Sequence, residues 1–168
     1  GGWNTGFSAI TGLSILDGTF TNTDMITSTS VTNIQLRNLL IRRANYNSGL
    51  SAGGRAICFY NTHQSVISNC IISNNGITAN GLTEGRILYL DGDADVGCHS
   101  NYINATVCDN YFYQTPVYIA GGHNTFTGII ANNHIWGPGV PITGIEFYWY
   151  YNPDLALNNG NMLLNSII

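Results

Sequence analysis

The acidic segment Asp91-Gly92-Asp93-Ala94-Asp95 places three carboxylates at alternate positions in a chain with nine acidic residues in all. Alternate carboxylates in a loop can converge on one hard cation, as they do at the start of calcium loops. An EF-hand would continue with Gly and then Glu where this sequence has Val96 and Tyr102. We therefore expect no cofactor, and the alternative is a loop-bound Ca²⁺ held by Asp91, Asp93 and Asp95.

The richest aromatic run of the sequence covers residues 145–151 and reads Ile-Glu-Phe-Tyr-Trp-Tyr-Tyr. Successive side chains of a strand alternate between its faces, so at least two of these rings should point outward. Exposed rings beside carboxylates suit sugars, because C–H faces pack on rings and hydroxyls form hydrogen bonds. The alternative is burial of the outer rings by a neighbouring subunit. The predicted ligand-binding residues are Glu146, Tyr148, Trp149 and Tyr150, together with Asp91, Asp93 and Asp95.

Three histidines, His63, His99 and His123, each follow a short apolar run. If these runs stack, equivalent residues lie about 4.8 Å apart, whereas metal ligands must converge at about 2 Å from one ion. We expect the imidazoles to line one edge and to bond turn backbone, and we expect no metal site.

Two arginines, Arg55 and Arg86, hold equivalent places after Gly54 and Gly85. Stacked guanidinium groups repel unless a carboxylate lies between them, and Glu84 is the obvious partner. We interpret the two arginines as a structural pair.

Composition narrows the class of protein. The 168 residues carry a net charge of -4, so the basic stripe of a nucleic-acid-binding protein is absent. No apolar run approaches the length of a membrane span. The four cysteines match no metal-binding spacing, and we interpret them as buried thiols, with one or two disulfides as the alternative. They are Cys58, Cys70, Cys98 and Cys108.

The elements that must position these residues are short repeated strands. The segment IIANNHI (residues 129–135) has a close copy in IISNNGI (71–77) and a looser copy in TVCDNYF (106–112). Asn75, Asn110 and Asn133 fall in register, 35 and then 23 residues apart. Repetition of this kind is typical of stacked supersecondary units. Asparagine tolerates the left-handed turn conformation and can pair its amide with the asparagine of the next unit.

Strands fill the repeat, because β-branched and aromatic residues alternate with polar ones and no helical period is present. One unit reads apolar strand, polar turn with histidine, strand, asparagine-rich turn, strand. The paired asparagines after short strands resemble the right-handed parallel β-helix of the pectin-lyase-like superfamily, an architecture that bacteriophage tailspikes share. The resemblance implies an all-β solenoid of about five rungs over residues 12–168. We expect one domain, residues 1–168, that is a fragment of a longer chain.

The resemblance implies three candidate functions. The first is a virion or cell-surface module, tailspike-like or tail-fibre-like, that binds a host glycan or receptor. The second is a polysaccharide hydrolase or lyase, for which the sequence shows no complete catalytic set. Similarity to the pectate lyases of this fold would make Arg55 or Arg86 the basic group of a lyase site. The third is a structural spacer or adhesin stalk. Resemblance to tailspikes also implies a homo-oligomer, with a trimer first, and an extracellular or virion-surface location.

Overall fold

The structure is a computed structural model that describes residues 12–18, 24–44, 55–76, 86–93, 97–112, 115–135, 144–148 and 160–164. Every regular element in these ranges is a β-strand, which confirms the all-β class. No helix in the described ranges is long and apolar enough to cross a membrane.

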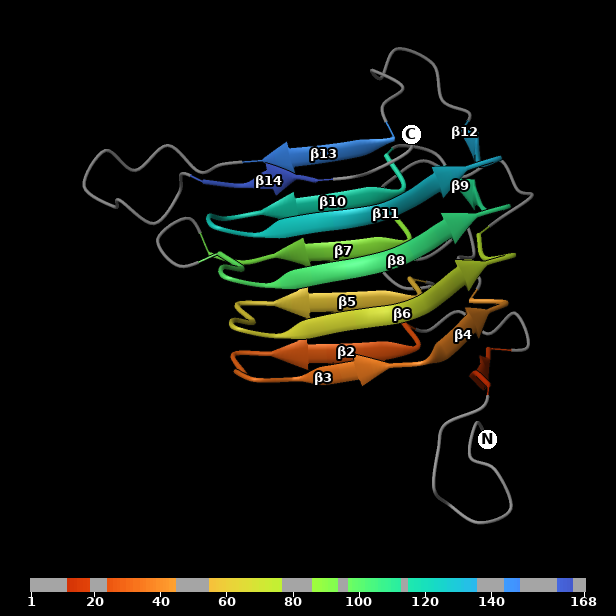
Figure 1. Ribbon diagram of the computed structural model, residues 1–168, viewed down its shortest axis with the longest axis horizontal. Coiled ribbons are helices and arrows are strands. Elements are labelled where there is room, and N and C mark those ends of the chain that lie inside the picture. Colours follow the sequence, from red (N-terminus) through yellow and green to blue (C-terminus); the bar gives the residue numbers. More distant parts are fainter. Residues whose placement is uncertain are drawn as a thin grey trace.

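Two parallel sheets carry most of the described residues (Figure 1). The five-stranded sheet has the order β13 (Ile145–Tyr148), β10 (Val117–Ala120), β7 (Leu88–Asp91), β5 (Ile57–Tyr60) and β2 (Ile26–Thr29). The seven-stranded sheet has the order β1 (Ser14–Asp17), β4 (Leu39–Arg42), β6 (Val66–Ser73), β8 (Tyr102–Cys108), β11 (Thr125–Ala131) and β14 (Met162–Leu163), and β3 (Gln35–Arg37) also pairs with β6. A third sheet pairs β9 (Tyr111–Phe112) with β12 (His134–Ile135).

The chain visits the two large sheets in turn. Strands β2, β5, β7, β10 and β13 of one sheet are each followed by a strand of the other, and each such pass adds one neighbour to both sheets. The strands of the two sheets run in opposite directions, and successive passes lie one above the next (Figure 1). All strand pairs between passes are parallel, as the repeat predicted.

The core lies between the two large sheets. Alternate residues of β5, β7, β8 and β10 are fully buried and belong to one apolar cluster, which includes Phe59, Leu90, Val107 and Ile119. Burial of each such side chain stabilises the fold by roughly 1.5–3 kcal/mol relative to exposure. The observed alternation places the intervening side chains of both sheets on their outer faces.

At the turns that follow strands of the seven-stranded sheet, two neighbouring residues have different structural roles. The first has a positive φ, as in Asn74 at 54° and Asn132 at 53°, and the next residue carries the amide ladder. We expected one asparagine to do both, because this residue tolerates the left-handed region. The structure assigns the two properties to neighbouring asparagines, which explains why the sequence repeats them in pairs.

The predicted ladder of Asn75, Asn110 and Asn133 is confirmed. Nδ2 of Asn75 donates to Oδ1 of Asn110 at 3.0 Å, and Nδ2 of Asn110 donates to Oδ1 of Asn133 at 3.0 Å. Each Oδ1 also accepts the backbone N–H of the asparagine in the preceding pass, at 2.9 Å and 3.1 Å. Buried polar groups require such partners, so the ladder fixes the register of successive passes.

A second ladder stands at the opposite turn and was missed by the sequence analysis. Nδ2 of Asn101 donates to Oδ1 of Asn124 at 2.9 Å, and the backbone N–H of Asn124 donates to Oδ1 of Asn161 at 2.8 Å. Ser65 holds the equivalent place in the preceding pass, and its N–H donates to Oδ1 of Asn101 at 3.0 Å. An asparagine just before each strand Tyr102–Cys108 and Thr125–Ala131 was the available signal.

Candidate binding face

The outer face of the five-stranded sheet carries a stack of tyrosines. The rings of Tyr89 and Tyr118 lie 5.3 Å apart between centroids with an angle of 18°, because the two residues are in register on neighbouring strands. Tyr148 of β13 adds a third ring at 5.8 Å from Tyr118. Tyr89 and Tyr118 form an apolar cluster separate from the core, and both are buried. Tyr148 is 43% exposed and is the accessible end of this stack.

Both predicted arginines lie on this tyrosine stack. Cζ of Arg55 is 4.2 Å from the ring centroid of Tyr89, and Cζ of Arg86 is 3.7 Å from that of Tyr118. A guanidinium group over an aromatic face is attracted by the ring quadrupole. Arg55 also pairs with Asp24, with 3.7 Å between Nη1 and Oδ2. The expected partner Glu84 lies outside the described residues, and the observed contacts of Arg86 are the rings of Tyr89 and Tyr118.

The first two rings of the aromatic run lie on opposite faces of the strand, as the alternation of side chains requires. Phe147 packs against the core, and the next residue, Tyr148, points outward. Glu146 is half-buried and faces the same side as Tyr148, opposite Tyr118 of the neighbouring strand. Trp149 and Tyr150 lie outside the described residues. Of the predicted aromatic run, the described part of the binding face is therefore Glu146 and Tyr148.

The acidic segment begins at the end of β7 on the same face. Oδ1 and Oδ2 of Asp93 accept hydrogen bonds at 2.8 Å from the Tyr60 hydroxyl and the Asn61 amide. These bonds favour the carboxylate and hold the pKa of Asp93 below its usual range, with Asn61 the larger cause. Asp91 accepts a hydrogen bond from the hydroxyl of Tyr89. Asp95 lies outside the described residues, and within the described ranges no three acidic, histidine or cysteine side chains converge as a metal site would need.

Tyr118 lies between the acidic segment and the aromatic run, which are the two predicted parts of the binding face. Burial raises the pKa of Tyr118, and the nearby carboxylates of Asp91 and Glu146 raise it further, while Arg86 lowers it. The strand register agrees with this position of Tyr118, because Tyr118 lies opposite both Tyr89 and Glu146 on the neighbouring strands. Asp91, Glu146 and Tyr148 therefore surround one buried ring, although 57 residues separate the first from the last.

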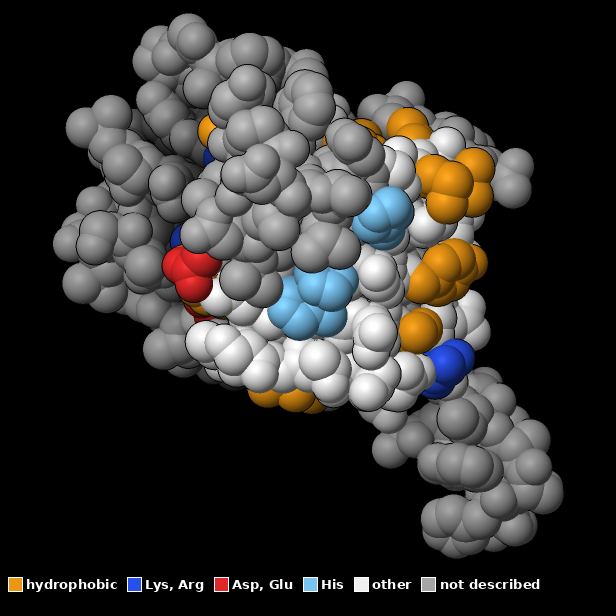
Figure 2. Space-filling view, turned by 90° about the vertical axis from the view of Figure 1, so that its left-hand side faces the viewer, with side chains coloured by type: hydrophobic (Ala, Val, Ile, Leu, Met, Phe, Trp, Pro, Cys, Tyr) orange, Lys and Arg blue, Asp and Glu red, His pale blue; other side chains and the backbone are white. Residues whose placement is uncertain are grey.

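The histidines lie at the turn that connects the five-stranded to the seven-stranded sheet, on the face shown in Figure 2. His63 and His99 are in register, and their rings stack at 3.8 Å between centroids with an angle of 19°. Burial lowers the pKa of both imidazoles, and for His63 the neighbouring His99 lowers it further. Nδ1 of His63 is buried without a hydrogen-bond partner, so the expected bond to turn backbone is not made there.

The third histidine corrects the predicted alignment. Ser100 donates its N–H to the carbonyl of Gly122, which places Gly122 and not His123 at the position of His99. His123 instead takes the left-handed conformation with φ 56°, as Ser100 does with φ 57°. The reason is that the asparagine ladder sets the register, and His123 directly precedes its ladder residue Asn124, whereas His99 lies two residues before Asn101.

All four cysteines are free thiols, but Cys58 and Cys108 are only half-buried, so the prediction of buried thiols holds for two of the four. Cys70 and Cys98 are buried, and burial raises the pKa of Cys98 to about 12. Nη1 of Arg55 lies 3.1 Å from Sγ of Cys58, which ties that thiol to the tyrosine and arginine face.

No protein family, curated protein or solved structure matches the chain. The chemistry of the face itself remains informative. An exposed phenol ring lies among carboxylates and a tyrosine hydroxyl on a parallel sheet, and sugars use both apolar faces and hydroxyl groups in binding.

Proposed function

We propose that the chain is a right-handed parallel β-helix of about five rungs that binds a glycan on a virion or cell surface, in the manner of a tailspike or tail fibre. The alternation of the chain between two parallel sheets supports the helix. The ordered asparagine ladders support it too, because each aligns one pass on the next. The coarser class, all-β with parallel sheets, is independent of this proposal.

One observation carries the glycan-binding function: Tyr148 exposes its ring beside Glu146 on the face that also presents Asp91 and Asp93. The ring offers an apolar surface to a sugar, and the carboxylates accept hydrogen bonds from its hydroxyls. Three described carboxylates, those of Asp91, Asp93 and Glu146, lie at this face, and Arg86 adds a half-buried positive charge over Tyr118.

Assembly into a homo-oligomer, with a trimer as first choice, belongs to the same proposal. The outer face of the seven-stranded sheet aligns Ile15, Leu40, Ile71 and Ile129 through its register, interrupted by Thr106. Ile15 is 55% exposed and Ile129 is 39% exposed. Aligned exposed aliphatic residues favour an interaction surface. Light scattering of the purified chain tests this part, and a monodisperse monomer contradicts it.

A panel of neutral, amino and acidic oligosaccharides tests the function. Each is titrated against the chain, and the mixture is then assayed for new reducing ends and for unsaturated products. We expect binding without product release. Product release would instead support the polysaccharide-degrading enzyme, and absence of binding to every glycan would support the structural spacer.

A further inference from the structure

Asn75 differs from the other asparagines of the two ladders in the residue that follows it. Its neighbour is Gly76, whereas the others precede residues with side chains, namely Tyr102, Tyr111, Thr125, His134 and Met162. In an Asn–Gly pair the backbone nitrogen of glycine can attack the side-chain carbonyl carbon of asparagine. Glycine hinders this attack least, because it has no side chain and the widest backbone freedom. The pair Asn75–Gly76 is therefore chemically labile by its sequence.

The fold requires both members of this labile pair. Asn75 supplies the amide that continues the ladder to Asn110. Gly76 has φ 104°, and a Cβ at this position would run into the carbonyl oxygen of Tyr111. A residue with a side chain cannot take the place of Gly76, so the turn combines the two residues that react most readily with each other.

The folded chain holds the reacting groups of this pair in other bonds. The N–H of Gly76 donates to the carbonyl of Ala44 at 2.9 Å, and the N–H of Ala44 donates to Oδ1 of Asn75 at 2.9 Å. Nδ2 of Asn75 donates to the carbonyls of Ile41 and Ser73, each at 3.1 Å. Asn75 is only 2% exposed. Attack by the Gly76 nitrogen would have to break these bonds, so the fold opposes the reaction.

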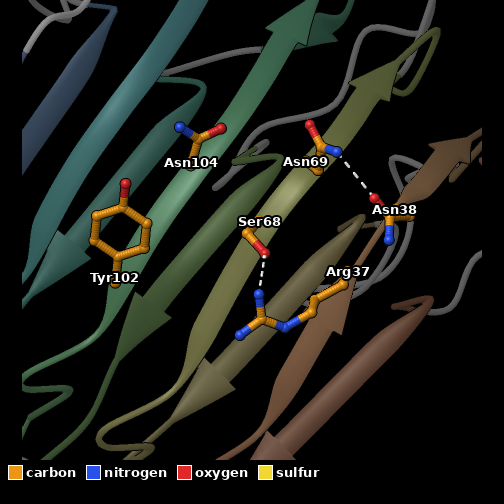
Figure 3. A pocket seen from close by; sticks show the side chains of 6 residues that line it. All are labelled: Arg37, Asn38, Ser68, Asn69, Tyr102 and Asn104. Carbon is orange, nitrogen blue, oxygen red and sulfur yellow. Dashed lines mark hydrogen bonds between the residues drawn. The ribbon is translucent and has the colours of Figure 1, made fainter. Parts of the chain in front are cut away.

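An asparagine of the outer sheet face has the opposite combination of properties. Figure 3 shows Asn69 beside Asn38, and Nδ2 of Asn69 donates to Oδ1 of Asn38 at 2.9 Å. Asn69 is exposed to water, but the next residue is Cys70, whose side chain hinders attack by its backbone nitrogen. Asn69 therefore separates the effect of exposure from the effect of the following residue.

We propose that Asn75–Gly76 is a deamidation site that the folded chain protects and that unfolding opens. The Gly76 nitrogen loses its proton and bonds to Cγ of Asn75, the bond between Cγ and Nδ2 breaks, and the side-chain nitrogen leaves as ammonia. One water molecule then opens the cyclic imide and leaves aspartate or isoaspartate at this position. The reaction consumes only water, and neither an oxidant nor a reductant takes part.

The product does not fit the ladder. Nδ2 of Asn75 faces three acceptors, which are the carbonyls of Ile41 and Ser73 and Oδ1 of Asn110. An ionised carboxylate only accepts hydrogen bonds, and a protonated one has a single donor for these three acceptors. Burial of polar groups without partners is unfavourable, and isoaspartate also lengthens the backbone by one carbon. Deamidation in the unfolded chain therefore makes unfolding irreversible.

The first test compares deamidation in native buffer and in denaturant at mildly alkaline pH. Peptide mapping by mass spectrometry follows the amides of Asn69, Asn75 and Asn110 in the unmodified chain. In denaturant Asn75 should convert while Asn69 and Asn110 remain amides. In native buffer Asn75 should convert at least about a hundredfold more slowly, because only a small fraction of the chain is unfolded. Equal rates in the two conditions, or an Asn75 that stays intact in denaturant, would overturn the proposal.

The second test examines the product directly through Asn75→Asp. The matched control is Asn74→Asp, which adds the same charge one residue away at an exposed position of the same turn. Both variants and the unmodified chain are unfolded and then diluted into neutral buffer, and circular dichroism measures the fraction that refolds. Asn75→Asp should recover far less folded chain, whereas Asn74→Asp should match the unmodified chain. Equal recovery in the two variants would contradict the exclusion of the product from the ladder.

Discussion

Asn110 lies directly between Asn75 and Asn133, and all of its side-chain polar groups are engaged. Its Oδ1 accepts from the backbone and side chain of Asn75, and its Nδ2 donates to Asn133 and to the carbonyl of Ile72 at 2.9 Å. Asn110 has no exposed surface. The residue therefore bonds three successive passes without contact with water.

Asn110→Leu should destabilise the fold by about 2–4 kcal/mol, because a buried N–H of Asn75 and a buried carbonyl of Ile72 lose their partner. Asn133→Leu should cost roughly 1–3 kcal/mol, since Asn133 is only half-buried. The measurement is the free energy of unfolding from denaturant titration. Asn132→Gly is the control, because glycine adopts the same left-handed turn. A change below about 0.5 kcal/mol in Asn110→Leu would mean that the ladder does not hold the passes together.

The strands, their parallel stacking and the first asparagine ladder could be predicted because the sequence repeats them at matching places. The second ladder was missed because its first position is Ser65 and its copies share little beyond Asn101 and Asn124. The sequence repeat does not fix the register of residues within the turns. His123 was therefore aligned one residue away from its true position. Periodicity identifies strands more readily than it fixes turn register.

The candidate site was predictable only in part. Alternation predicted that Phe147 and Tyr148 lie on opposite faces without fixing which of them points outward, and the structure places Phe147 against the core and Tyr148 outside. The contribution of Tyr89 and Tyr118 was not anticipated, because nothing local marks two tyrosines 29 residues apart as neighbours.

Stability should depend on pH through the stacked pair His63 and His99. Burial depresses the pKa of both imidazoles below the ordinary value of 6.5, so the unfolded chain binds protons more readily than the folded one. The stabilisation is therefore complete above about pH 6.5 and is lost as pH falls through the depressed folded values.

Denaturant titration between about pH 5 and pH 8 measures this effect. His99→Gln should flatten the decline in the free energy of unfolding on the acid side, because it removes one titrating ring and the neighbour of the other. His134→Gln, an exposed residue on the third sheet, should leave that decline in place. A decline of the same size in His99→Gln and in the unmodified chain would contradict the assignment.

Cys98 should resist alkylation in the folded chain. Burial raises its pKa to about 12, and only the thiolate reacts. Mass spectrometry after iodoacetamide treatment at about pH 8 should find Cys98 unmodified until denaturant unfolds the chain. Prompt modification of Cys98 at a rate independent of denaturant would show that the core around it is open.

The central claim is that the exposed edge of the five-stranded sheet binds a glycan through Tyr148. The most direct measurement is a calorimetric titration, with the best ligand from the oligosaccharide panel, of the unmodified chain, Tyr148→Ala and Tyr111→Ala. Tyr111 is the matched control because its ring is 48% exposed on another sheet. Tyr148→Ala should weaken binding by roughly 1–3 kcal/mol while the chain stays folded, and Tyr111→Ala should leave binding unchanged. Equal affinities for all three proteins would contradict the claim.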